Sequence, residues 1–284
     1  MLDTPRKLSL KLTLVLATCM ACSAGAKETV SGSPVEEAPA LDASISQDDA
    51  ASSARDAMPE PPPPPPLDAG PPPDPEACRK LAALVRDFNA SHPDFEKYTS
   101  DFEYKRLVAD SLGSDNKPSY LPTGRTPVTT GPSEFAQWYR ATAGVNIEVP
   151  VELRLVEESK GLYVYDSDAF FPVDGAGFNE VTQGHNFLFT TEIHTSFTYH
   201  GGEKFTFTGD DDLWLFINRK LAIDLGGTHP ELKGEIDLDA EFVRFGLERG
   251  KSYPMDIFHA ERHTPGSHFR LETSIECFVP VSLI

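Results

Sequence analysis

The sequence predicts an all-β fold with minor helices, a jelly-roll-like β-sandwich that follows a disordered stalk. Two observations lead to this prediction. Apolar and polar residues alternate with a period of two through much of the second half of the chain, and turn residues separate the short alternating segments. All Phe, Trp and Tyr residues begin at Phe88, so the folded unit is expected at 78–284, a length that suits one large β-domain.

Two short segments are expected to be helical. In Ser91–Glu96, a serine cap is followed by proline and acidic residues, which is typical of a helix start. In Pro132–Arg140, the aromatic residues Phe135, Trp138 and Tyr139 fall on one face at i, i+3, i+4 spacing. We interpret that aromatic stripe as core packing rather than as a ligand platform.

Strands are expected at Leu81–Phe88, Ile193–Tyr199, around Phe205 and Phe207, Leu213–Ile217, Leu221–Asp224, Tyr253–His259 and Phe269–Ile275. Gly201 and Gly202 would turn the chain between the second and third of these, which predicts a hairpin. Leu213–Ile217 is apolar at every position, so it is expected to be a central strand covered on both faces.

Residues 1–26 are predicted to be an export signal peptide of the lipoprotein type. Arg6, Lys7 and Lys11 precede a short apolar stretch at Leu12–Ala17, and small residues follow it. The apolar stretch is too short to span a bilayer. The protein is therefore expected to be exported across the inner membrane and held at the outer membrane or cell surface by a lipid anchor.

Cys22 is the preferred anchor. Cleavage before Cys22 removes Cys19 and leaves Cys78 and Cys277 as an even pair in an oxidising compartment, whereas cleavage before Cys19 leaves an extra thiol. Cys19 has the better residue three positions before the cut, and ordinary secretion with a cut after Ala26 is also open. Cys78 and Cys277 are expected to form a disulfide that closes a loop of nearly the whole domain.

Residues 27–77 are predicted to be a disordered linker. This segment has no aromatic residue and is rich in Pro, Ala, Ser and acidic residues, so it cannot bury enough apolar surface to offset its chain entropy. The run Pro61–Pro66 favours the polyproline II conformation. The linker should act as a semi-rigid stalk that holds the domain away from a surface.

The main candidate site is the run Asp210, Asp211 and Asp212, which directly precedes the apolar strand. Adjacent carboxylates repel one another, so they need a cation or several hydrogen-bond donors for compensation. A metal site is the favoured interpretation, and a capped turn is the alternative, because Asp side chains often bond their own backbone at strand ends. The net charge of −19 argues against nucleic acid as a partner and is compatible with cations or neutral sugars.

Several blocks of the chain resemble one known family. They are Val85–Phe88, His92–Glu96, Gln137–Arg140, Phe170–Gly175, Gly184–Phe187, Phe207–Asn218, Asp224–Gly227, Phe258–His263 and Gly266–Phe269. In this order, over about 200 residues, they are similar to the fibro-slime domain family, a branch of the superfamily first named in anthrax protective antigen (PA14). The resemblance implies a β-sandwich of secreted and surface-attached proteins, often linked to carbohydrate.

The resemblance also implies a calcium site that holds sugar hydroxyls. In sugar-binding members of the superfamily, two neighbouring aspartates joined by a cis peptide bind the ion, and alignment places that pair at Asp210 and Asp211. The glycine that follows in the superfamily is replaced here by Asp212, which either adds a ligand or gives the loop a different shape.

Calcium binds about six to eight oxygen ligands, so two neighbouring loops, Gly226–Gly234 and Glu261–His268, are expected to complete the site. Glu261 is the candidate ligand in the second loop, with a salt bridge to Arg262 or Arg270 as its alternative role. His229 and His263 are the candidate sugar contacts besides the two aspartates. The expected cofactor is calcium and the expected partner is a polysaccharide or glycoconjugate.

Enzymatic interpretations are less favoured. The spacing of His259, Glu261 and His263 differs from the helical zinc-protease motif, although alternation would place all three on one side of a strand. Paired carboxylates could serve glycoside hydrolysis, but no serine or cysteine nucleophile motif is present. The sequence therefore predicts a calcium-dependent carbohydrate-binding or adhesion module at the cell surface, with a structural or protein-binding module as the alternative.

Overall fold

The computed structural model describes residues 74–98 and 100–281. Within them the chain forms mostly antiparallel strands with two short helices, which confirms the predicted all-β class with minor helices. The expected signal peptide at 1–26, its anchor Cys22 and nearly all of the expected linker at 27–77 lie outside the described residues. In the part of the chain that is described, no helix is long and apolar enough to cross a membrane.

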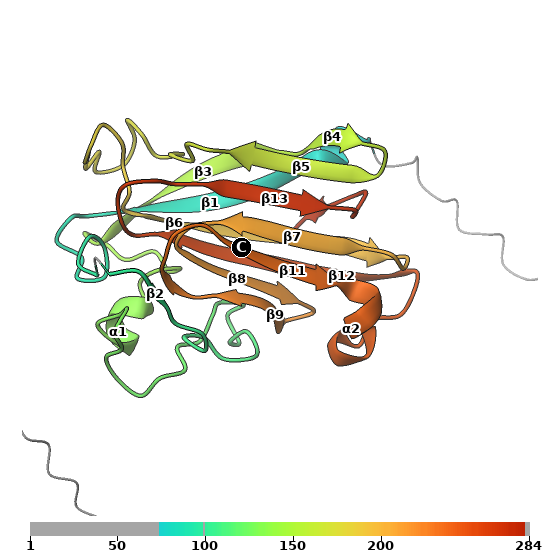
Figure 1. The fold of residues 1–284 in the computed structure, drawn as a ribbon, viewed down its shortest axis with the longest axis horizontal. Helices are drawn as coiled ribbons and strands as arrows, with labels where there is room; N and C mark the ends of the chain where they lie inside the picture. The colour runs from blue at the N-terminus through green and yellow to red at the C-terminus, as the bar shows by residue number, and fades with distance from the viewer. Residues whose placement is uncertain (1–73, 99, 282–284) are drawn as a thin grey trace, which may run out of the picture. The chain divides into compact units, whose positions relative to one another are not determined.

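Two antiparallel sheets form the sandwich (Figure 1). The larger sheet has seven strands, in the order β3 (Asn146–Arg154), β1 (Lys80–Phe88), β6 (Phe189–Tyr199), β12 (Lys251–Glu261), β8 (Asp212–Ile217) and β9 (Lys220–Leu225), with β14 (Val279–Pro280) also paired to β6. The smaller sheet has five, in the order β11 (Leu232–Asp237), β7 (Lys204–Gly209), β13 (Phe269–Thr273), β5 (Leu162–Ser167) and β4 (Val156–Ser159). A separate short pairing joins β10 (Gly227–Thr228) to β2 (Phe102–Glu103).

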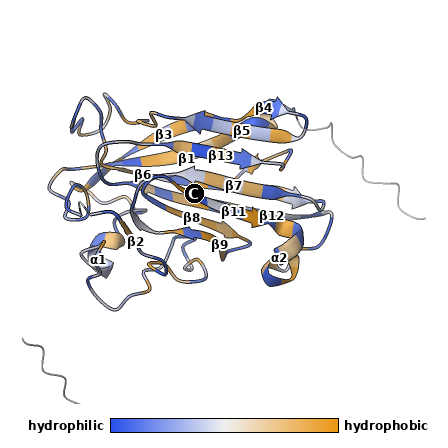
Figure 2. Ribbon diagram, viewed as in Figure 1, coloured by the Kyte–Doolittle hydropathy of each residue, from blue (hydrophilic) through white to orange (hydrophobic). Residues whose placement is uncertain are grey.

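The main hydrophobic core lies between the two sheets. Alternate residues of β8, namely Leu213, Leu215 and Ile217, are buried in it, and Figure 2 shows apolar residues along the strands of both sheets. The other β8 side chains, Trp214 and Phe216, are buried in a second core. β8 is therefore covered on both faces, as its unbroken apolar sequence predicts.

The second core is covered by the segment between β1 and β3. This segment carries α1 (Pro132–Phe135), which is a single short helix and ends well before Arg140, where the sequence pattern places the end. The rings of Phe135 and Trp214 are 5.9 Å apart. The aromatic stripe is fully buried, as expected for core packing, and consists of Phe135, Trp138 and Tyr139. The other helix, α2 (Leu238–Phe245), follows β11.

The prediction of a helix at Ser91–Glu96 is wrong. Asp94 in this segment is buried, and its carboxylate accepts hydrogen bonds from the backbone N–H of Thr130 at 2.7 Å and from Nε1 of Trp138 at 3.1 Å. Phe95 is also fully buried. Tertiary contacts fix this segment in an irregular conformation and override its local preference for a helix start.

The predicted hairpin across Gly201 and Gly202 is also wrong. β6 belongs to the seven-stranded sheet and β7 to the five-stranded sheet, so the turn between them carries the chain from one layer to the other. Both glycines adopt positive φ, 96° and 91°. The buried Glu203 carboxylate accepts the backbone N–H groups of His200 and Gly201, which closes the turn. Alternation identifies both strands but does not say which neighbour each one pairs with.

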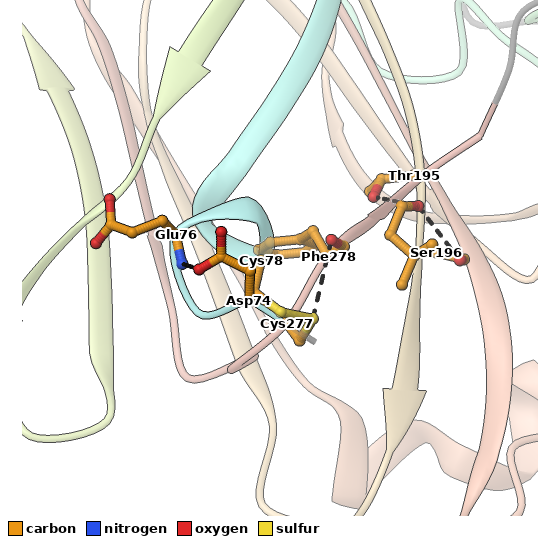
Figure 3. Close-up of a disulfide and its surroundings, with 8 residues drawn as sticks. Asp74, Glu76, Cys78, Thr195, Ser196, Cys277 and Phe278 are labelled. Carbon is orange, nitrogen blue, oxygen red and sulfur yellow. Dashed lines mark hydrogen bonds between the residues drawn. A yellow bond between two sulfur atoms is a disulfide. The ribbon is translucent and has the colours of Figure 1, made fainter. Parts of the chain in front are cut away.

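The predicted disulfide is confirmed: Cys78 and Cys277 are bonded, with a sequence separation of 199 (Figure 3). Cys78 lies in the 3-10 turn Ala77–Arg79 directly before β1. Next to the disulfide, the backbone N–H of Phe278 donates to the carbonyl oxygen of Cys78 at 3.0 Å. A loop of this length is worth about 4 to 5 kcal/mol in the chain-entropy description of cross-links.

A buried group of charges occupies the outer face of the larger sheet. Arg86 on β1 and Lys117, from the segment that covers the second core, both pair with Glu192 on β6. His194 on β6 contacts Glu192 through Nε2, and its Nδ1 lies 2.6 Å from the Asp256 carboxylate on β12. All of these except Lys117 are buried. The charges are therefore compensated within the group, as burial demands.

Two pKa values in this group set the pH range in which it stabilises the fold. Burial disfavours protonated His194, but the hydrogen bonds to Asp256 and Glu192 outweigh it and raise the histidine pKa above its ordinary 6.5. Burial alone would raise the pKa of Glu192, yet His194, Arg86 and Lys117 lower it from 4.5 to about 2. The stabilisation from Glu192 is therefore lost as pH falls from 4.5 toward about 2, and that from His194 is lost as pH rises through its raised pKa.

We expect the free energy of unfolding to fall as the pH rises from the ordinary histidine pKa of 6.5 through the raised pKa of His194, because the folded protein binds this proton more tightly than the unfolded chain does. His194→Gln should make this decrease smaller, whereas His200→Gln, which changes an exposed histidine, should leave it unchanged. Urea denaturation at a series of pH values measures the slope. The same slope in His194→Gln as in the unchanged protein would contradict this assignment.

Candidate functional site

A pocket of about 360 Å³ lies where β7 ends, β8 begins and β12 ends. Asp210, Asp211, His229 and His263 line it, so the structure brings together all four residues that the sequence predicts as sugar contacts. We call it the acidic pocket. Its remaining lining residues are Tyr98, Ser100, Asp101, Thr228, Pro230, Glu231 and 264–266. The two loops predicted to complete a metal site therefore both reach it.

Asp210 and Asp211 form the link that carries the chain from β7 in one sheet to β8 in the other. The residue before them is Gly209. Only glycine fits at this position, because a Cβ there would lie only 2.3 Å from the carbonyl oxygen of His268. The backbone N–H of His268 donates to Oδ1 of Asp210 at 2.6 Å. Oδ2 of Asp210 faces Gly266 in the pocket wall, where an added Cβ would lie 3.3 Å from it.

Asp211 is held from the two opposite loops. Its Oδ1 accepts the backbone N–H of His229 at 3.1 Å, and its Oδ2 accepts that of Arg262 at 2.9 Å. Only 5% of the residue is exposed, and burial raises the pKa of its carboxyl to about 8, against the opposing effect of the Arg262 charge. The side chain is thus fixed beside the pocket at a high electrostatic cost.

Glu261 is the least compensated carboxylate at the site. It is fully buried at the end of β12, and among the described residues neither of its oxygens has a hydrogen-bond partner. The hydroxyl of nearby Ser267 donates instead to Phe170. Burial first, and then the neighbouring Asp211 and Asp210 carboxylates, raise the pKa of Glu261 well above its ordinary value, against the opposing effect of the nearby Ser267 hydroxyl and His263 backbone N–H. Unpaired carboxyl oxygens beside two further carboxylates are the donor set that a hard cation prefers.

The alternative role of Glu261 in a salt bridge is not observed. Arg262 pairs with Asp212, with Nη2 2.6 Å from Oδ2, and Arg270 pairs with Asp166 and Glu272. Both arginines therefore pair with carboxylates other than Glu261. Asp210, Asp211 and Glu261 supply the kind of oxygen donors that calcium prefers, but in the described part of the chain they do not form a group whose ligand atoms all lie within 4.8 Å of one another, so the three do not converge on one ion position in this structure.

Asp212 does not join this group, contrary to the prediction that it is a metal ligand. It is fully buried, and its Oδ2 accepts Nε of Arg262 at 2.6 Å while its Oδ1 accepts the backbone N–H of Gly227 at 2.6 Å. Both oxygens are therefore used away from the pocket. The aspartate in place of the superfamily glycine serves an internal ion pair.

Arg262 uses the rest of its guanidinium to hold the segment that covers the second core. Its Nη1 donates to the carbonyl oxygens of Asp94 at 3.3 Å and Val128 at 2.8 Å. The guanidinium carbon also lies 4.7 Å from the ring centroid of Trp138. Asp212 and Arg262 together connect the pocket end of β8 and β12 to that segment.

The expected cis peptide between Asp210 and Asp211 is not present. In residues 74–98 and 100–281 the cis peptide bond is Thr264–Pro265, in the opposite pocket wall. A trans link is sufficient here because hydrogen bonds from His268, His229 and Arg262 already set the direction of each carboxylate.

The structure separates His259 from His263. His263 lines the acidic pocket, whereas His259 is fully buried with its ring 5.2 Å from that of Phe269. Burial lowers the pKa of His259 to about 4, so the imidazole is neutral, and its Nε2 lies 3.0 Å from the carbonyl oxygen of Asp210. His259 therefore supports the aspartate link from within the core, which argues against a shared zinc site.

A second group of potential ligands lies near the acidic pocket. Nε2 of His268 is 3.4 Å from Asp166 and 3.5 Å from Asp168, while its Nδ1 is 2.7 Å from Glu231. In the described part of the chain, Asp166, Asp168 and His268 are the group whose ligand atoms all lie within 4.8 Å of one another. Arg270 already pairs with Asp166, so part of this charge is neutralised.

Sequence reasoning did not identify Tyr98, Asp101 and Glu231 as pocket residues. The first two reach the pocket because β2 pairs with β10, and because the hydroxyl of Thr228 donates to the carbonyl oxygen of Ser100 at 3.0 Å. These contacts join segments more than 100 residues apart. No local pattern in the sequence reports such a pairing.

Residues 161–277 match the model of the PA14 domain family. Two relatives from Dictyostelium discoideum are 39% identical: protein psiC over 69% of this chain and 40% of its own length, and protein psiQ over 70% and 21%. The chain thus spans less than half the length of these relatives. Among solved structures, the PA14 domain of the antifreeze protein MpAFP covers 70% of this chain and 87% of its own, with 8% identity and a TM-score of 0.26.

We expect Arg262→Met to lower the free energy of unfolding by about 3 to 5 kcal/mol, because it leaves Asp212 buried without its partner. Arg154→Met is the matched control, since Arg154 pairs with Glu76 on the surface and such pairs are worth less than about 1 kcal/mol. Urea denaturation of both variants measures the difference. Equal effects of the two substitutions would contradict the central role of Arg262.

Proposed function

We propose that this protein is a calcium-dependent carbohydrate-binding or adhesion module of the fibro-slime branch of the PA14 superfamily. The observation that carries the proposal is Glu261, a buried carboxylate near Asp210 and Asp211 that has no hydrogen-bond partner among the residues that the structure describes. We further propose that the protein is exported, anchored by a lipid on Cys22 at the outer membrane or cell surface, and binds polysaccharide or glycoconjugate rather than catalysing a reaction.

The electrostatics of the three carboxylates support a metal-dependent role. Buried like charges cannot all be ionised unless something compensates them, and the raised pKa values of Asp211 and Glu261 express that cost. Protonation can remove this electrostatic repulsion by neutralising the carboxylates. A divalent cation removes the repulsion while the carboxylates stay ionised. Bound calcium would supply open coordination positions for neutral oxygen ligands.

The pocket supports a sugar as that neutral ligand. Asp210 reaches its wall with Oδ2, so an ion held there would face the pocket volume. His263 lines the pocket and has ring nitrogens that can donate to or accept from hydroxyl groups. The buried His229 contributes less, because its Nδ1 lies 2.9 Å from the carbonyl oxygen of Pro230 and its Nε2 lies 3.3 Å from that of Leu225. A volume near 360 Å³ is within the range of small-ligand sites, and Tyr98 and two prolines add apolar surface.

We expect residues 74–284 to bind calcium and to be stabilised by it. Saturation at 100 times the dissociation constant should raise the free energy of unfolding by about 2.7 kcal/mol. Asp211→Asn and Glu261→Gln should each weaken calcium binding at least about tenfold, because each removes a charged ligand at nearly constant shape. Isothermal titration calorimetry measures the affinity.

Asp166→Asn is the control for this titration, because Asp166 belongs to the second ligand group and not to the acidic pocket. It should leave the calcium affinity unchanged. If calcium binding persists in Asp211→Asn and Glu261→Gln but is lost in Asp166→Asn, the ion binds at the wrong place for this proposal. No binding at all would favour the alternative of a structural or protein-binding module.

A glycan array tests the ligand class directly. We expect glycan binding in the presence of calcium and its loss when the chelator EGTA is added, because calcium would hold the sugar hydroxyls. The Glu261→Gln variant should bind no glycan under either condition, although its fold, checked by circular dichroism, is retained. Glycan binding that is insensitive to the chelator would contradict the calcium-dependent mechanism.

A further inference from the structure

Two further hollows, of about 510 Å³ and 460 Å³, lie over the outer face of the larger sheet and share no lining residue with the acidic pocket. Leu84 of β1 and Glu148 of β3 line the first, while Ala82 and Pro150, two residues along the same strands, line the second. Residues two apart on a strand point to the same face, so the two hollows adjoin. We call the pair the sheet-face groove.

One end of the groove is charged and buried. Its lining there includes Arg86 on β1, His194 on β6 and Asp256 on β12, each at most 5% exposed. Arg86 pairs through Nη1 with Glu192 at 2.5 Å and through Nη2 with Glu148 at 2.8 Å. Its buried Nε has no hydrogen-bond partner among the described residues. An unpaired buried donor is destabilising, so this end favours a ligand that brings an acceptor.

Positively charged groups gather at this end. Arg86, Lys117 and His194 all contact the one carboxylate of Glu192. Although burial opposes it, the two carboxylate contacts of His194 raise its pKa, so it stays protonated to a higher pH than an ordinary histidine. Arg219, in the turn between β8 and β9, contacts backbone carbonyl oxygens and a side-chain amide, and it forms no salt bridge with a carboxylate of the described residues.

These four positive groups meet three carboxylates, those of Glu148, Glu192 and Asp256. A fourth carboxylate, that of Asp115, also lines the groove, but Arg140 neutralises it from outside the lining, with Nη2 at 2.7 Å. One positive charge is therefore in excess here, although the whole chain carries −19. At physiological salt the field of distant charges is screened within about 8 Å, so the local excess decides which ligand binds.

The other end of the groove is apolar. Ala82, Pro150 and Pro280 line it, and Leu84 continues the apolar surface toward the charged end. Its two charged lining residues pair with each other. None of the described residues that line either hollow is Phe, Tyr or Trp, so the groove has no flat hydrocarbon ring on which a sugar could stack. Its aliphatic surface can instead bury aliphatic side chains.

We propose that the sheet-face groove binds the C-terminal segment of a partner protein, an extended peptide with aliphatic side chains and a free α-carboxylate. The carboxylate pairs with Arg219 and Lys117 and cancels the excess positive charge, while the side chains pack along Ala82 and Leu84. A peptide without the terminal carboxylate loses the pairing. The groove needs no calcium, so this proposal goes beyond the acidic pocket and does not depend on it.

The test titrates four ligands calorimetrically into the full-length protein in the presence of EGTA. They are the peptide acetyl-Gly-Ala-Val-Ala-Leu with a free carboxylate, its C-terminal amide, acetyl-Gly-Ser-Ser-Ser-Ser with a free carboxylate, and oligogalacturonate. We expect the amide to bind at least about tenfold more weakly than the first peptide, because it loses charge-assisted hydrogen bonds. The serine peptide should bind at least about fivefold more weakly, because it buries less apolar surface.

Each ligand can overturn one part of the proposal. Equal binding of the amide would overturn the carboxylate pairing, and equal binding of the serine peptide would overturn the apolar contact. Equal or tighter binding of oligogalacturonate would overturn the peptide as the ligand class. If no ligand binds, the groove is not a peptide site, and the calcium-dependent site stands because EGTA removes its ion from every titration.

Two variants with matched controls locate the site. Arg219→Gln should weaken binding of the free-carboxylate peptide about two- to fivefold and leave binding of the amide unchanged, whereas Arg249→Gln, at an exposed arginine outside the groove, should change neither. Ala82→Gln should weaken both peptides because it fills the apolar end, and Ala240→Gln, at an exposed alanine on α2, is its control. Circular dichroism checks the fold of each variant. Unchanged binding in both Arg219→Gln and Ala82→Gln would overturn the groove as the site.

Discussion

The ion pair between Arg262 and Asp212 connects the larger sheet, the segment that covers the second core and the acidic pocket. Asp212 begins β8 and Arg262 follows β12, and both are fully buried. The guanidinium then bonds carbonyl oxygens of Asp94 and Val128 in the segment that covers the second core. The backbone N–H of the same Arg262 donates to Asp211. One residue thus connects the sheet, its cover and the pocket, because a buried guanidinium has donors in several directions that must all be satisfied.

Around that ion pair the carboxylates divide into two kinds. Asp94 and Asp212 each accept two hydrogen bonds and are structural. In residues 74–98 and 100–281, Glu261 has no hydrogen-bond partner on either carboxylate oxygen. The difference is not one of burial, since Asp212 and Glu261 are equally inaccessible. It lies in the number of hydrogen-bond donors at each carboxylate, because Asp211, like Asp94 and Asp212, accepts two hydrogen bonds, whereas both oxygens of Glu261 lack a partner among the described residues.

Local patterns predicted seven of the fourteen strands in the described residues, together with the burial of β8 on both faces, because alternating or unbroken apolar residues reveal which side chains are buried. The number and positions of the cysteines predicted the disulfide. The family resemblance, and not a local pattern, led to the prediction that Asp210, Asp211, His229 and His263 share one site, and all four line the acidic pocket. Local patterns failed where an outcome depends on distant partners. Asp212 lies beside its fellow aspartates in sequence, but its role is set by Arg262 fifty residues away. The turn after β6 looks like a hairpin until the sheet to which β7 belongs is known.

The disulfide in Figure 3 also determines how the domain responds to mechanical force. Cys78 and Cys277 bring the two ends of the sandwich to a Cα separation of 4.3 Å. Tension applied to a chain that enters before Cys78 and leaves after Cys277 passes across this one covalent bridge instead of along the strands. The sheets between the two cysteines then carry no load, so the acidic pocket keeps its shape under a pull that would unravel an unbridged sandwich.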